Sequence, residues 1–71
     1  MTPTRILQDA AIEAGALASY LADRPRGACP ERLTERLAGW RRLLDRPHDE
    51  GDMVARVAHR LLREAVERID P

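Results

Sequence analysis

Apolar residues recur three and four positions apart along three segments of the chain, which is the period of an amphipathic helix. The first segment covers residues 3–23, the second 30–45 and the third 50–69. No segment shows the alternation with a period of two that a β-strand needs. The sequence therefore predicts an all-α fold of three helices.

Each segment has a stripe of apolar residues that is expected to face the core. The predicted stripes are Leu7, Ala10, Ala14, Leu17 and Leu21; Leu33, Leu37, Trp40 and Leu44; and Val54, Ala58, Leu61 and Ala65, widened by Val57, Leu62, Val66 and Ile69. The connections between the helices are short, and short connections join antiparallel neighbours. We expect one domain over residues 1–71, folded as a small antiparallel three-helix bundle.

Polar residues that can cap a helix stand near each predicted start. Thr2 precedes a proline, an arrangement that favours a helix N-terminus. A proline also follows Cys29, which makes this cysteine the nominal cap of the second helix. Asp49 is the expected cap of the third helix, with Asp52 three residues further on.

The first and third helices carry more apolar surface than one small bundle needs. On a helical projection, apolar or small residues cover close to half the circumference of each. We therefore expect a homodimer, or an assembly with another protein, and the residues expected to face the partner are Ile12, Tyr20, Leu43, Leu62 and Val66. The small flank of the first helix, which is Ala11, Gly15, Ala18 and Ala22, fits either packing on the third helix of the same chain or contact with another chain.

Charge and composition exclude some function classes. Twelve arginines balance twelve acidic residues, so the formal net charge is zero and the basic excess of a dedicated nucleic-acid binder is missing. The chain has no Lys, Asn or Phe, which fits a GC-rich bacterial or phage genome. It has neither the long apolar run of a signal peptide nor a stretch that could cross a membrane, so we expect a cytoplasmic protein.

The third helix has a basic face. One histidine and three arginines share it at helical spacing: Arg56, His59, Arg60 and Arg63. Such a row can bind an anion or an acidic partner. The alternative is a solvated face in which Glu64 and Glu67 form ion pairs with arginines one turn away.

No catalytic, cofactor or metal motif is visible. The acidic segment at residues 45–52 lacks the ligand spacing of a calcium loop, and one cysteine with two scattered histidines does not make a zinc set. Cys29 is the only cysteine, so it is an inert residue near a helix start, a redox-sensitive thiol or an intermolecular bridge. Trp40 lies on the second apolar stripe and is expected in the core. The connection at residues 46–51 is longer than the turn of a helix-turn-helix motif.

These features favour a small non-enzymatic interaction or regulatory protein: an adaptor, an antitoxin-like binder or a phage-type inhibitor of a larger complex. Its partner would be a second copy of the chain or another protein. Two alternatives remain. One is a nucleic-acid-associated protein that uses the arginine face, and the other is a small helical enzyme whose site forms between subunits.

Overall fold

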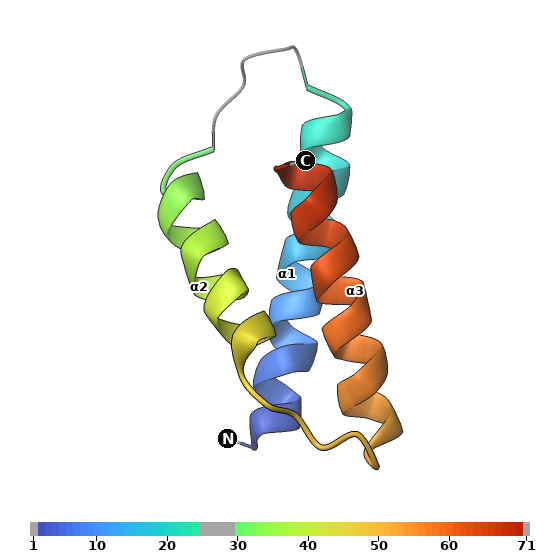
Figure 1. The fold of residues 1–71 in the computed structure, drawn as a ribbon. Coiled ribbons are helices and arrows are strands. Elements are labelled where there is room, and N and C mark those ends of the chain that lie inside the picture. The colour runs from blue at the N-terminus through green and yellow to red at the C-terminus, as the bar shows by residue number, and fades with distance from the viewer. Residues whose placement is uncertain (1, 25–29, 71) are drawn as a thin grey trace.

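The computed structural model describes residues 2–24 and 30–70, and over these ranges it contains three α-helices and no strand (Figure 1). They are α1 at Pro3–Ala22, α2 at Leu33–Asp45 and α3 at Met53–Ile69. Consecutive helices run in opposite directions, which confirms the predicted antiparallel bundle. As a consequence α1 and α3 run parallel, and their N-terminal ends lie at the same end of the molecule (Figure 1).

The pair formed by α1 and α3 is the most closely packed part of the fold. Its buried surface is rich in alanine, contributed by both helices: Ala10, Ala11, Ala14, Ala18, Ala55, Ala58 and Ala65. Methyl side chains let two helix backbones approach closely. Larger side chains complete the core, and among them Leu62 is fully enclosed.

Helix α2 covers this pair with two buried side chains, Leu37 and Trp40, and packs mainly against α3. Trp40 is therefore a core residue, as predicted. Polar contacts also join α2 to α3: the Nε2 of His59 donates to the carbonyl oxygen of Leu44 at 2.9 Å, and Arg41 pairs with Asp70. Carbonyls in the last turn of a helix have no partner within it, so His59 satisfies one of them.

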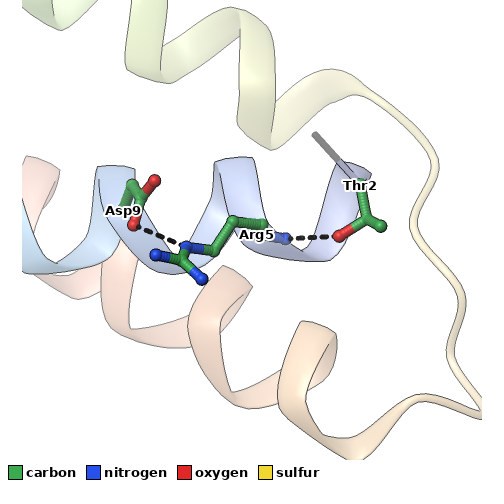
Figure 2. Close-up of polar contacts among 3 residues, drawn as sticks. All are labelled: Thr2, Arg5 and Asp9. Carbon is green, nitrogen blue, oxygen red and sulfur yellow. Dashed lines mark hydrogen bonds and ion pairs between the residues drawn. The ribbon is translucent and has the colours of Figure 1, made fainter.

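Helix α1 begins where the sequence predicts. The side-chain oxygen of Thr2 accepts a hydrogen bond from the backbone N–H of Arg5 at 3.2 Å, and the Arg5 side chain pairs with Asp9 at 3.3 Å (Figure 2). The ion pair is exposed and spans one turn, so it contributes only a few tenths of a kcal/mol. The cap is the main local signal that fixes this end.

The start of α3 differs from the prediction. Its cap is Asp52 rather than Asp49, because the Asp52 carboxylate accepts from the backbone N–H groups of Val54 and Ala55 at 3.0 and 3.3 Å. Asp49 instead accepts from the N–H of Gly51 at 2.9 Å and shapes the loop before the helix. The helix therefore starts at residue 53, three residues later than predicted.

The start of α2 also lies three residues later than predicted. Its N-cap is Arg32, which has a left-handed backbone (φ 62°, ψ 24°) and makes no side-chain cap. The Arg32 side chain pairs with Glu35 at 3.1 Å. Cys29, the predicted cap, lies outside the described residues.

Candidate interaction surfaces

An apolar patch crosses from α1 to α3. Five large side chains in it are 40–71% exposed: Ile12, Met53, Val54, Val57 and Leu61. They border an open groove of about 410 Å³ that Gln8, Ala11 and Ala58 complete. We call this surface the apolar patch.

The patch lies on the side of the α1–α3 pair that faces away from α2. On α3, Val57 and Leu61 each lie two positions from His59 along the chain, which corresponds to about 200° of helical turn. His59 contacts the end of α2. Val57 and Leu61 therefore project from the opposite flank of the helix, and no α2 residue lines the groove.

The residues predicted to face a partner do not all share this surface. Ile12 lies in the apolar patch and is 71% exposed. Leu62 and Val66 are buried by their own chain, and Leu43 is half-buried against the core, so these three offer little surface to a partner. Tyr20 is exposed near the end of α1, outside the patch, with the guanidinium of Arg24 over its ring at 4.3 Å.

The burial of these residues follows from the alanine-rich contact between α1 and α3. The predicted stripe of α3 alternated alanines with Val54 and Leu61, and its alanines Ala58 and Ala65 are buried, whereas the helix turns Val54 and Leu61 away from α1. Ala55, outside the predicted stripe, is buried, and Val54 and Leu61, inside it, are about half exposed. The matching abundance of alanine on both helices was the sequence signal for this rotation.

The small residues on one flank of α1 are partly buried in the protomer and partly exposed to solvent. Ala11 and Ala18 are buried in the protomer, so these two pack within the chain. Gly15 is half-buried, and a Cβ built on it meets no atom within 4 Å. Ala22 is exposed. Within the protomer, Gly15 is therefore not needed to let two helices pack closely.

A second surface collects the predicted basic face. Two histidines, three arginines and three other residues line a hollow of about 340 Å³: His48, Glu50, Met53, Arg56, Val57, His59, Arg60 and Arg63. We call it the arginine hollow. The contribution of His48 and Glu50 from the loop before α3 was not foreseen in the sequence, since it depends on how that loop folds back.

His59 holds a defined position at the base of this hollow. It is 8% exposed and bonded to Leu44 as described above. Because a carbonyl only accepts, the His59 proton sits on Nε2, which leaves Nδ1 free to accept from the Nη2 of Arg63 at 3.4 Å. The ring of His48 stacks on that of His59, with centroids 4.4 Å apart and planes inclined by 21°.

The ion pairs expected along α3 are not formed in the described part of the chain. The ion pairs found there join Arg5 to Asp9, Arg32 to Glu35 and Arg41 to Asp70. Glu64 and Glu67 therefore do not neutralise the arginines one turn away. Within residues 2–24 and 30–70, Arg56, Arg60 and Arg63 have no carboxylate within ion-pair distance.

The described ranges contain no group of three or more His, Cys, Asp or Glu side chains placed to hold a metal ion. Nor does any described helix combine the length and apolar character needed to span a bilayer. Comparisons with protein-family models, with curated proteins and with solved structures gave no match to this chain.

Proposed function

We propose that this protein is a non-enzymatic interaction module that docks its apolar patch against a second copy of itself. The observation that carries the proposal is the set of five large apolar side chains exposed side by side across α1 and α3. Large contiguous apolar surfaces on small proteins mark interaction sites. A regulatory role, as an adaptor or an inhibitor of a larger complex, would follow from such a docking surface.

A dimer through this surface would use one broad face of the molecule, of which the apolar patch is a part. The molecule extends 40 × 21 × 19 Å, so the whole broad face measures roughly 800 Å², about the area that each partner buries in a standard interface. Complete burial of a Val, Leu, Ile or Met side chain contributes about 1.5–3 kcal/mol. The patch side chains are partly exposed, so two copies gain on the order of 10 kcal/mol, against an association cost of ~4–15 kcal/mol. The expected dimer is therefore weak and concentration-dependent.

Two features favour a second copy as the occupant. The net charge is zero, so two copies meet without overall repulsion. On the C-terminal side of Ile12, the flank of α1 beside the patch also lacks charge, since Gly15, Ala16 and Ser19 follow there. A two-fold axis through the patch would place uncharged surface against uncharged surface, as a self-complementary interface requires.

Sedimentation of the wild-type chain from roughly 1 µM to 500 µM tests this proposal, with interface sizes of this class as the guide. We expect a shift from monomer to dimer within this range. Leu61→Glu and Ile12→Glu should each keep the protein monomeric, because they bury a charge at the centre of the contact. Thr34→Glu, which adds the same charge to the exposed surface of α2, is the matched control and should dimerise normally.

Circular dichroism of the three variants separates assembly from folding. Ile12, Leu61 and Thr34 are all exposed, so helicity should be retained in each variant. A wild-type protein that stays monomeric at the highest concentration contradicts the proposal. Normal assembly of both patch variants would also contradict it, because the interface would then lie elsewhere.

A further inference from the structure

The arginine hollow concentrates positive charge that forms no ion pair with a carboxylate of residues 2–24 or 30–70. Three guanidinium groups line it, and the carboxylate of Glu50 is the acidic group among its lining residues. We propose that the arginine hollow binds a phosphate group, carried by a small phosphorylated ligand. This inference is independent of the dimer, although Met53 and Val57 belong to both surfaces.

The arginines are spaced for a shared ligand. Arg56, Arg60 and Arg63 lie on successive turns of one helix face and span about 10 Å along its axis, a distance that long arginine side chains can close around one group. A guanidinium presents several N–H donors in a planar fork that matches the oxygens of a phosphate. Because no carboxylate of the described chain pairs with these three groups, none has to be displaced first.

His59 holds one of these three guanidinium groups, that of Arg63, in position. Its ring is buried and fixed by Leu44, and its Nδ1 holds the Arg63 guanidinium at the wall of the hollow. The stacked His48 ring covers the other side of the imidazole. His59 is thus a positioning residue: it reduces the freedom that Arg63 would lose on binding, which is the general benefit of a preorganised site.

The chemistry favours a single phosphate group over a polymer. A phosphate carries up to two negative charges and three strong acceptor oxygens, enough to engage several guanidinium groups at once. A nucleic-acid backbone needs a basic track along many phosphates, and a chain of zero net charge has no basic excess to form one. The hollow of about 340 Å³ has room for a phosphate and a small attached group.

Titration of the ¹⁵N-labelled protein with inorganic phosphate, at constant ionic strength, tests the inference by nuclear magnetic resonance. We expect saturable shifts at the side-chain N–H groups of Arg56, Arg60 and Arg63. Arg60→Gln should weaken binding roughly tenfold or more, since a hydrogen bond to a charged group is lost. Arg42→Gln, which removes an exposed guanidinium from α2, is the matched control and should bind as the wild type does.

The same titration in the Ile12→Glu background removes any effect of dimer formation. Binding should be unchanged there, so failure of the dimer proposal would leave this one standing. Shifts that rise linearly without saturation, or equal affinity in Arg60→Gln, would overturn the inference.

Two further probes identify the source of the phosphate. O-phosphoserine is expected to bind at least as tightly as inorganic phosphate, because the hollow accommodates an attached group. A single-stranded oligonucleotide should bind no more tightly per phosphate. If the oligonucleotide binds far more tightly, with the steep salt dependence of many phosphate contacts, the small-ligand inference is wrong.

Discussion

The hydroxyl of Thr4 donates a hydrogen bond to the carboxylate of Asp52, with 2.8 Å between the two oxygens. Thr4 lies in the first turn of α1 and Asp52 caps α3, so this bond ties together the N-terminal ends of the two parallel helices. The Thr4 hydroxyl, with the backbone N–H groups of Ala55 and Val54, lowers the pKa of Asp52 below its ordinary value of 3.8, and partial burial opposes this only in part. All three donors favour the ionised carboxylate.

This lowered pKa predicts a loss of stability in acid. The unfolded chain binds a proton on Asp52 at a higher pH than the folded chain does, so the contribution of Asp52 is complete above pH 3.8 and is lost as the pH falls through the folded-state value. Asp52→Asn keeps a good capping side chain without a titrating group. Thermal melts at pH 7 and pH 3 should therefore show a smaller difference in this variant than in the wild type.

Thr4→Val is the companion variant for this experiment. It removes the first cause of the shift while Asp52 still caps α3, so the acid-dependent difference should become smaller but should not vanish. Equal pH dependence in the wild type and both variants would mean that Asp52 does not contribute to the loss of stability.

Leu61 and Leu62 make a matched pair for testing which face of α3 is turned toward the core. They are adjacent leucines in the same helix, but Leu62 is fully buried whereas Leu61 is 47% exposed. Leu62→Ala should lower the free energy of unfolding by about 2–5 kcal/mol, because it leaves a cavity in the core. Leu61→Ala should lower it by less than about 1 kcal/mol when measured at low micromolar protein, at which the proposed dimer would be dissociated. Denaturant unfolding at low micromolar protein checks both values, and equal losses would show that the helix faces are assigned wrongly.

The same pair shows what the sequence could and could not predict. Helical periodicity was sufficient for the fold class, the number of helices and the core role of Trp40. It could not choose between neighbouring leucines, because both lie within the wide apolar arc of α3. That choice depends on how closely α1 approaches, which is a property of two helices together rather than of either alone.

The candidate surfaces were predictable to different degrees. Arg56, Arg60 and Arg63 share one face by helical spacing alone, so the sequence was sufficient to group them. The stacking of His48 on His59 could not be predicted, because it depends on the path of the loop before α3. The apolar patch was predicted only at Ile12, since Val57 and Leu61 were assigned to the core.

Gly15→Ala is expected to stabilise the protein. Glycine in the interior of a helix costs about 0.5–1 kcal/mol relative to alanine. A Cβ at this position meets no atom within 4 Å in the protomer, so the substitution brings no clash. The free energy of unfolding should therefore rise by roughly 0.5–1 kcal/mol in denaturant titrations at low protein concentration. A destabilised variant would contradict the open space at this position, because the added methyl group would then meet a neighbour within the folded protomer.

Repeating the sedimentation series with Gly15→Ala adds information about the interface. A methyl group at the edge of the contact should change the dimer affinity only slightly if the copies meet at Ile12 and Leu61. If the variant folds stably but no longer dimerises, the helices of the two copies must cross at Gly15. The proposed centre of the interface would then be wrong.

Arg32 is the one non-glycine residue of the described ranges with a positive φ, and replacing it with glycine should stabilise α2. Its left-handed conformation, at φ 62°, costs a non-glycine residue about 1 kcal/mol or more, a cost that glycine does not have. The substitution also removes the ion pair with Glu35, but both side chains are about 70% exposed, so that loss is only a few tenths of a kcal/mol. Arg32→Gly should therefore raise the free energy of unfolding by roughly 0.5–1 kcal/mol, whereas Arg32→Ala, which loses the ion pair and keeps the backbone cost, should lower it slightly. If glycine and alanine have the same effect in denaturant titrations, the left-handed conformation at this helix start is not a source of strain.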